Sequence, residues 1–188
     1  MKLFAITTAY LFLSLCTYAQ QSTDIKSGTS PGNRYPLPEF NNQPAYFNEE
    51  SNALIELEKP KYYVKAKRNA SAILTGIGKA GVYMNANIEK SPVRIKKKDT
   101  IILIMQTPEG KDPSTALEIT ACTSGKGKRM LLVSEVKTFQ NAKNVYEKVP
   151  YLVKKMQDNV YFFVIPAIGP GEYFIFTDAG FFAFGVDN

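Results

Sequence analysis

Short segments in which apolar and polar residues alternate follow one another through the chain after residue 51. Each is rich in β-branched or aromatic residues and ends at a cluster of Gly, Pro, Asn or Lys. A period of two places the apolar side chains of a strand on one face. Strands at a spacing of roughly 8–12 residues, with turn residues between them, are typical of an antiparallel sandwich or barrel. The predicted strands are 54–58, 62–67, 81–86, 92–95, 101–106, 117–122 and 130–136.

Residues 160–186 carry the strongest pattern of this kind and are predicted to form three further strands, separated by Gly and Pro. Aromatic residues occupy both faces of these strands. The second face is therefore either covered within the domain by the preceding N-terminal segment or is an interface. Only residues 138–146 have the spacing of a short helix, with Phe139, Ala142 and Tyr146 on one side. The pattern as a whole predicts an all-β domain.

Tyr173 follows a Pro170-Gly171 turn between two of these strands. An apolar strand, a Pro-Gly turn and a tyrosine, in this order, resemble the corner between strands E and F of immunoglobulin-like sandwiches. There the tyrosine hydroxyl bonds back to the backbone just upstream. The resemblance implies an antiparallel immunoglobulin-like β-sandwich in which Pro170, Gly171 and Tyr173 form a structural corner. The chain has no Trp, and Phe176 stands near the place of an antibody-domain Cys, so the resemblance is to the architecture only.

Residues 1–19 have the organisation of a secretory signal peptide. A lysine near the start is followed by an apolar stretch, and Thr17 and Ala19 place small residues before a cleavage site. The apolar stretch is too short to span a bilayer, which needs about 20 residues. Cys16 leaves lipoprotein processing open as an alternative, although the bulky Leu15 stands where a bacterial lipobox places a small residue. We expect an exported protein of the periplasm or cell surface that does not span the membrane after cleavage.

Residues 20–50 are rich in Pro, Ser and Asn and predict an extended tether, because such a composition buries little apolar surface. The segment nevertheless contains four aromatic residues: Tyr35, Phe40, Tyr46 and Phe47. We therefore expect its second half to lie against the domain. Residues 51–188 are predicted to form one β-sandwich domain, since this length is ordinary for a single core.

The chain has no histidine and two cysteines, of which only Cys122 would remain after signal cleavage. The absence of histidine excludes Ser-His-Asp and Cys-His hydrolases and histidine-ligated metal sites. A single thiol excludes dithiol redox chemistry and thiolate metal sites. We expect no cofactor and no metal. Residues 76–81 fit the G-x-G-x-x-G pattern, but no helical pattern follows them, so they predict a glycine-rich hairpin or bulge rather than a phosphate site.

Basic residues outnumber acidic ones, and they occur in clusters. A basic surface attracts acidic polymers, although charged hairpin tips and edge strands also protect proteins from aggregation. The predicted binding patch combines two clusters: Arg94, Lys96, Lys97, Lys98, Lys126, Lys128 and Arg129. Two smaller sets are Lys59, Lys61, Lys65, Lys67 and Arg68, and Lys154 with Lys155. The aromatic residues lie elsewhere in the sequence, so a nucleic-acid partner is not expected.

Five short motifs follow one another between residues 51 and 187: Ser91-Pro-Val-Arg-Ile95, Asp112-Pro113, Lys128-Arg129, Pro170-Gly-Glu-Tyr173 and Phe184-Gly-Val-Asp187. In this order they resemble a group of uncharacterised exported β-sandwich proteins of Bacteroidetes. The resemblance implies export and the sandwich fold, and it implies no activity. Asp99-Thr100-Ile101 also resembles the O-glycosylation sequon of exported Bacteroidetes proteins, which predicts a modified Thr100.

These features predict an exported, non-enzymatic β-sandwich that acts as a binding or assembly module at the bacterial cell envelope. Its partner is expected to be an envelope protein or an acidic polymer. The first alternative is a polyanion-binding protein that recognises an acidic glycan or lipid head groups through the basic clusters. The second is a histidine-free glycan hydrolase, which would need two carboxylates about 5–10 Å apart in a cleft.

Overall fold

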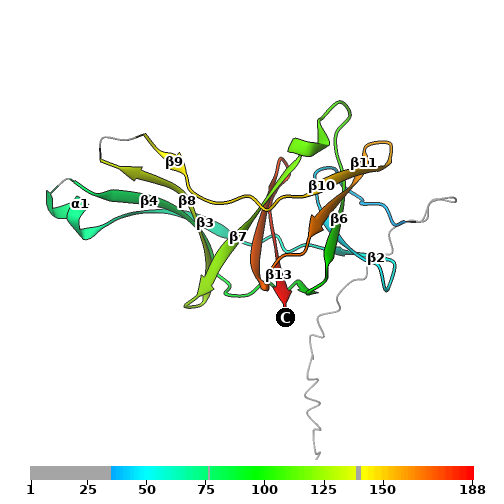
Figure 1. The fold of residues 1–188 in the computed structure, drawn as a ribbon, viewed down its shortest axis with the longest axis horizontal. Coiled ribbons are helices and arrows are strands. Elements are labelled where there is room, and N and C mark those ends of the chain that lie inside the picture. Colours follow the sequence, from blue (N-terminus) through cyan, green and yellow to red (C-terminus); the bar gives the residue numbers. More distant parts are fainter. Residues whose placement is uncertain (1–34, 76, 139–140) are drawn as a thin grey trace, which may run out of the picture.

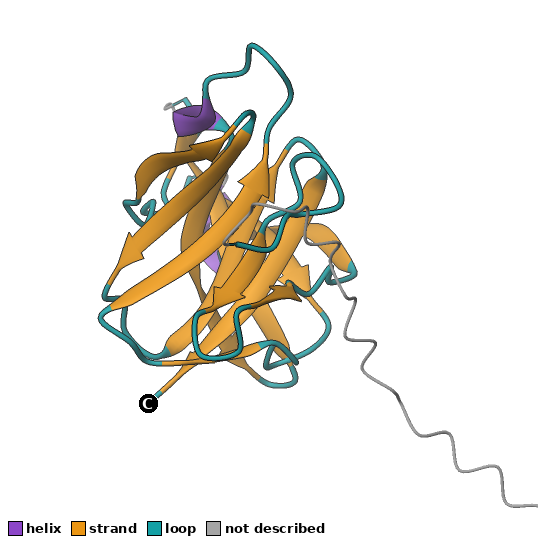
Figure 2. Cartoon of the chain, turned by 90° about the vertical axis from the view of Figure 1, so that its right-hand side faces the viewer, coloured by secondary structure: helices purple, strands orange, loops and turns teal. Residues whose placement is uncertain are grey.

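The computed structural model describes residues 35–75, 77–138 and 141–188. The predicted signal peptide and residues 20–34 of the predicted tether lie outside these ranges. Within them the fold is all-β, with strands arranged in two packed layers (Figure 1; Figure 2). The predicted antiparallel β-sandwich is therefore confirmed.

The first sheet has five strands, in the order β10-β11-β6-β1-β2. Its strands are β1 (Ala45–Asn48), β2 (Ala53–Glu56), β6 (Thr100–Gln106), β10 (Leu152–Gln157) and β11 (Val160–Pro166). The second sheet has the order β3-β4-β8-β7-β12-β13-β5, with β9 also paired to β8. Its strands are β3 (Tyr62–Arg68), β4 (Lys79–Ala86), β5 (Arg94–Lys96), β7 (Leu117–Gly125), β8 (Lys128–Lys137), β9 (Lys143–Asn144), β12 (Gly171–Thr177) and β13 (Gly180–Asp187). The helical elements are α1 (Ala70–Thr75) and the 3₁₀ turn η1 (Pro113–Thr115).

Part of each sheet repeats the immunoglobulin strand order. The row β1-β6-β11-β10 corresponds to strands A-B-E-D, and the row β7-β12-β13 corresponds to C-F-G. Strands β2 to β5 therefore lie, in chain order, between the A-like and the B-like strand. They form an insertion that has no counterpart in the seven-stranded arrangement.

The main core lies between the two sheets and is built from alternate residues of the central strands. Leu103 of β6, Phe163 of β11 and Ile175 of β12 are all inaccessible to solvent, and Phe184 of β13 joins them. Full burial of such a side chain stabilises a fold by about 1.5–3 kcal/mol. The period of two seen in the sequence thus selects the side chains that fill this core.

A second core cluster covers the opposite face of β12 and β13. Phe174 and Phe181 pack there against Ala86 of β4 and Leu131 of β8. Tyr62 at the start of β3 adds an edge-on contact with Phe181, with ring centroids 5.0 Å apart. The second aromatic face of β12 and β13 is therefore covered within the domain by β3, β4 and β8. That of β11 is covered by the N-terminal segment, as predicted: Tyr35 packs edge-on against Phe162 with ring centroids 5.1 Å apart.

Strand β1 lies inside the predicted tether, residues 20–50, and pairs with β6. Tyr46 and Phe47 are buried, and Tyr35 packs edge-on against Phe47 with centroids 5.6 Å apart. The folded domain therefore begins before residue 51, which corrects the predicted boundary. These aromatic side chains bury enough apolar surface to offset the entropy lost when the segment becomes ordered. The prediction of a tether was based on the average composition of residues 20–50, which is polar.

The predicted helix over residues 138–146 is wrong for the described part of that segment. Residues 143–144 form β9, which pairs with Ser134 and Glu135 of β8. Tyr146 packs against the second core cluster. The edge of β8 offers backbone hydrogen-bond partners, whereas a helix of about two turns is marginal without tertiary contacts.

Strands β3 and β4 and the far half of β8 leave the sandwich and project to one side, with α1 at the tip (Figure 1). We call residues 61–86 and 131–144 the arm. Every residue of β3 is exposed, because this strand pairs with β4 alone in the described structure. Gly78 of the glycine motif lies just before β4 and Gly81 lies within it, so a strand and not a helix follows the motif; Gly76 lies outside the described residues.

Candidate binding surfaces

A buried ion network joins the arm to the sandwich, with Arg129 at its centre. The Arg129 side chain is fully buried; its Nη2 lies 2.5 Å from Oε1 of Glu58, and its Nε donates to the carbonyl of Ile88 at 3.0 Å. Its guanidinium also lies over the ring of Phe174, 5.6 Å from the centroid. Glu58 precedes β3, Ile88 follows β4 and Arg129 is near the start of β8. One guanidinium therefore fixes the base of all three arm strands.

Glu172 of β12 continues this network on the sandwich side. One carboxylate oxygen lies 3.8 Å from Nη1 of Arg129, and the other is paired with Arg94. Arg94 also binds Asp187 through Nη2 at 2.6 Å, which raises the pKa of the guanidinium and lowers the pKa of the Asp187 carboxyl. A Cβ on Gly185 would overlap the Arg94 guanidinium. The glycine is therefore required for Arg94 to reach across β13 to Glu172.

These ion pairs change the predicted basic patch. Arg94 and Arg129 are paired internally, and Lys98 binds Glu50 at 3.2 Å. The remaining four cations are at least partly exposed: Lys96, Lys97, Lys126 and Lys128. Strands β7, β12 and β13 separate the first two from the last two. The seven predicted residues do not form one basic surface, because the fold brings acidic groups to three of them that sequence spacing does not reveal.

The predicted corner residues lie in the connection from β11, in one sheet, to β12, in the other. Pro170 precedes β12 and Gly171 is its first residue. The Tyr173 hydroxyl donates to the carbonyl of Gly169 at 2.7 Å, which is the bond that the immunoglobulin-like resemblance implied. The Tyr173 ring stacks on Phe184, with centroids 5.3 Å apart, and burial raises the pKa of the phenol. This corner holds the two sheets together and presents no binding group.

Cys122 lies on β7, on the same side of the sheet as the ion network. Burial raises the pKa of its thiol to about 12, and the nearby Arg129 lowers that pKa by a smaller amount. The thiolate is the reactive form of cysteine. A thiol with this pKa stays protonated at neutral pH, so Cys122 acts as a packing residue in this fold.

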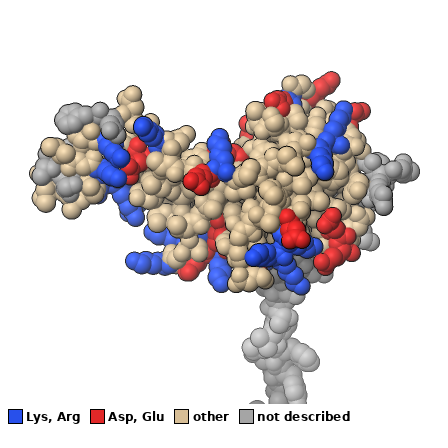
Figure 3. All heavy atoms as spheres, in the orientation of Figure 1, with Lys and Arg blue, Asp and Glu red and all other residues tan. Residues whose placement is uncertain are grey.

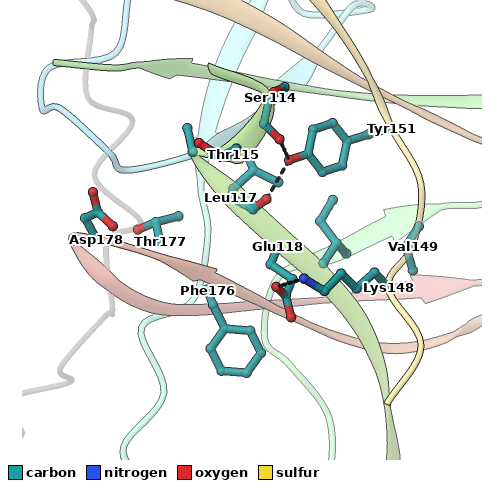
Figure 4. A pocket seen from close by; sticks show the side chains of 12 residues that line it. Ser114, Thr115, Leu117, Glu118, Lys148, Val149, Tyr151, Phe176, Thr177 and Asp178 are labelled. Atoms are coloured by element: carbon teal, nitrogen blue, oxygen red, sulfur yellow. Dashed lines mark hydrogen bonds and ion pairs between the residues drawn. The ribbon is translucent and has the colours of Figure 1, made fainter. Parts of the chain in front are cut away.

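A pocket of about 430 Å³ opens beside β7, between η1, residues 148–151 and the end of β12 (Figure 4). Glu118 projects into it and pairs with Lys148, whose Nζ lies 2.5 Å from a carboxylate oxygen. Tyr146 donates a hydrogen bond to Glu118, which together with burial raises the pKa of the phenol to about 12. Asp178, at the opposite end of the pocket, is paired with Lys111. Each carboxylate of the pocket is thus held by a lysine.

The arm exposes apolar side chains to an unusual extent. Of the twelve large apolar side chains that are exposed in the described structure, seven belong to it. On β3, Tyr62 is 52% and Val64 is 60% exposed; at the tip, Ile73 is 68%, Leu74 is 83% and Ile77 is 62% exposed. Sequence reasoning noted the basic residues of this segment but missed the tip. The sequence feature that could have indicated the exposed tip is the Ile-Leu pair between a basic strand and a glycine motif.

Lys and Arg side chains line the same arm (Figure 3). Residues 61–86 contain five basic residues and no acidic one. Exposed apolar and basic groups therefore share one projecting element, whereas the predicted patch on the sandwich is split and partly neutralised. The arm is the stronger candidate for a binding surface.

Among the described residues, none of the helices combines the length and the apolar character needed to span a membrane. Within the same residues, no three His, Cys, Asp or Glu side chains gather in a way that could hold a metal ion. No known family model and no curated protein matches the chain.

Proposed function

We propose that this chain is a non-enzymatic binding module of the bacterial cell envelope and that the arm is its contact surface. The observation that supports the proposal most directly is the concentration of exposed apolar side chains on one projecting element. Exposed apolar clusters of this kind mark interaction sites on monomeric proteins. In the described structure β3 pairs on one edge only, so the backbone groups of its other edge are available to a partner strand.

The buried network around Arg129 supports the same proposal. It binds the chain at the start of β3, the end of β4 and the start of β8, so the base of the arm has a fixed position on the sandwich. A surface that is already ordered loses less conformational entropy when it binds. A base held by buried ion pairs is therefore expected for an arm that binds a partner, and is not needed for a segment that only connects two strands.

Placement in the envelope is supported by the signal-peptide pattern of residues 1–19 and by the resemblance to exported Bacteroidetes proteins. Fractionation of the native host, followed by intact-mass spectrometry, tests it. A protein found outside the cytoplasm and lacking its first 19 residues is the expected result. The same spectra report whether Cys16 is acylated and whether Thr100 carries a glycan. A full-length cytoplasmic protein contradicts the proposal.

Site-specific photo-crosslinking in the native envelope tests the contact surface. The photoreactive residue replaces Val64 on the arm or, as the matched control, Leu152 on β10, whose exposed fractions are 60% and 65%. Both positions accept a larger side chain without disturbing the core. A discrete crosslinked species from position 64 and none from position 152 is expected. Equal crosslinking from both positions, or none from position 64, excludes β3 as the surface that contacts an envelope protein or glycan.

The structure supports the two alternative functions, polyanion binding and glycan hydrolysis, less well. A polyanion site keeps support only on the arm, because Arg94, Lys98 and Arg129 are neutralised internally. For a glycan hydrolase, the candidate carboxylates of the pocket are Glu118 and Asp178, and each is bound to a lysine. Turnover of any glycan that Glu118→Gln abolishes would overturn the non-enzymatic assignment.

A further inference from the structure

The tip of the arm combines an apolar end with a row of cations directly behind it. Lys79 and Lys137 are paired in register at the far ends of β4 and β8. Arg68 ends β3 beside them, opposite Ala80. Beyond this row the chain continues into α1, where Leu74 is 83% exposed. We call Arg68, Lys79 and Lys137 the collar.

Charge on the whole arm is strongly asymmetric. Its basic residues are Lys61, Lys65, Lys67, Arg68, Lys79, Lys137 and Lys143. Glu135 is the one acidic residue in the described part of the arm, and it pairs with Lys79 at 3.4 Å. Glu135 offsets one of these seven positive charges, so the arm remains net positive.

We propose that the arm tip binds the surface of an anionic phospholipid bilayer, with Ile73 and Leu74 entering the boundary between head groups and acyl chains and the collar meeting the lipid phosphates. This inference rests on the proposed function of the arm and names its partner. Apolar side chains buried at the interface and cations facing anionic head groups contribute together to such binding.

The shape of the tip favours a bilayer over a protein. A stable protein interface buries at least about 1,000 Å² in total with good complementarity. The tip offers three exposed apolar side chains at the end of a narrow projection (Figure 1; Figure 3). A bilayer surface is flat, soft and negatively charged, so it accepts a small convex apolar end and pairs with the cations around it.

The chain contains no tryptophan, which allows a direct test of insertion. Leu74→Trp places a single indole at the tip, and Leu152→Trp places one at an exposed position on β10. The exported protein, purified after processing by its host, is mixed with vesicles of phosphatidylcholine alone or with an equal part of phosphatidylglycerol. We expect a blue shift of emission for Leu74→Trp with the anionic vesicles only, and none for Leu152→Trp. Equal shifts at both positions, or none at position 74, overturn the proposal.

Vesicle co-sedimentation of charge variants tests the collar. Arg68→Glu with Lys137→Glu is expected to lower the apparent vesicle affinity at least about tenfold, whereas the matched pair Lys96→Glu with Lys97→Glu lowers it much less. All four side chains are at least partly exposed, so the fold is expected to survive, and far-ultraviolet circular dichroism checks this. Binding should weaken as salt rises. Equal loss in both pairs, or binding insensitive to the collar, contradicts the proposal.

Crosslinking from position 64 separates the two proposals. A protein or an acidic glycan crosslinked there, without vesicle binding, leaves the arm as the binding surface and excludes the lipid. Neither crosslinking nor vesicle binding excludes both.

Discussion

In β13 of the sandwich, six consecutive residues are buried, whereas β3 of the arm exposes all seven of its residues. Both strands belong to the same sheet, where β13 pairs with β12 and β5 and β3 pairs with β4. They differ in what covers their faces. β13 lies between the main core and the second core cluster, while no other element among the described residues covers most of β3.

The comparison shows that one sheet can serve two purposes along its length. Where both faces are covered, apolar burial stabilises the strands and dictates their side chains. Where they are not covered, ladder hydrogen bonds and the ion network at the base maintain the strands, and the side chains are available for contact. Regions with few buried apolar contacts open more easily than the core. The arm should therefore unfold locally before the sandwich does.

Truncation of the core should have the largest effect. Phe163→Ala removes a side chain that is inaccessible to solvent and should lower the free energy of unfolding by about 3–5 kcal/mol. Val64→Ala on the arm should change it by less than about 0.5 kcal/mol. Urea unfolding measures both, and similar values for the two would contradict the division between core and arm.

Arg129→Met should destabilise the protein by about 3 kcal/mol, because it leaves the buried Glu58 carboxylate without its cation and leaves Glu172 with Arg94 alone. The loss should be concentrated at the base of the arm. Hydrogen exchange of β3 and β4 amides should therefore accelerate more than that of β6 and β11. Lys96→Met, which removes an exposed cation, is the control. Uniform acceleration across both sheets would show that the network does not hold the arm in particular.

Tyr173→Phe tests the stability of the sandwich separately from that of the arm. Loss of the hydrogen bond to Gly169 should cost about 1 kcal/mol, and arm amides should keep their exchange rates. Tyr63→Phe, on the arm, should be neutral because that side chain is exposed. An equal effect of the two changes in urea unfolding would argue against a structural corner at Tyr173.

The smallest effect concerns pH. The Arg94 guanidinium lowers the pKa of the Asp187 carboxyl in the folded state. A carboxyl with a lowered folded pKa contributes stability above its unfolded pKa of about 4, and that contribution disappears as pH falls through the folded value. Asp187→Asn should therefore be less stable than the parent at pH near 7 and nearly equal to it at strongly acidic pH. A constant difference between the two urea midpoints across this range would exclude the linkage.

The strands could be predicted from the sequence because alternate side chains of a strand face the core and are therefore apolar. Segments 62–67, 101–106 and 130–136 correspond to β3, β6 and β8 within one or two residues. The failure at residues 138–146 has a different cause: the edge of β8 that pairs with β9 is close in sequence, but apolar spacing does not reveal that this edge is open to pairing. The aromatic residues before residue 51 were visible, but the partners of Tyr35 and Phe47 were not.

The basic clusters show most clearly what sequence spacing cannot predict. Their spacing predicted one patch, yet Arg94 and Arg129 both turn toward Glu172, which is separated from them by at least 43 positions along the chain. The exposed tip residues were missed for the opposite reason. Ile73 and Leu74 look like ordinary core residues, and only the projection of β3 and β4 leaves them without a covering layer.

The sequence by itself determined the all-β class, most strand positions, the tyrosine at the corner and the exclusion of histidine chemistry, because each depends on local spacing or on composition. Only the tertiary structure decided which charges are neutralised, where the domain begins and which apolar residues face solvent. Those properties depend on groups far apart in the chain, and their energies arise from burial and from pairing that exist only after the two sheets have packed.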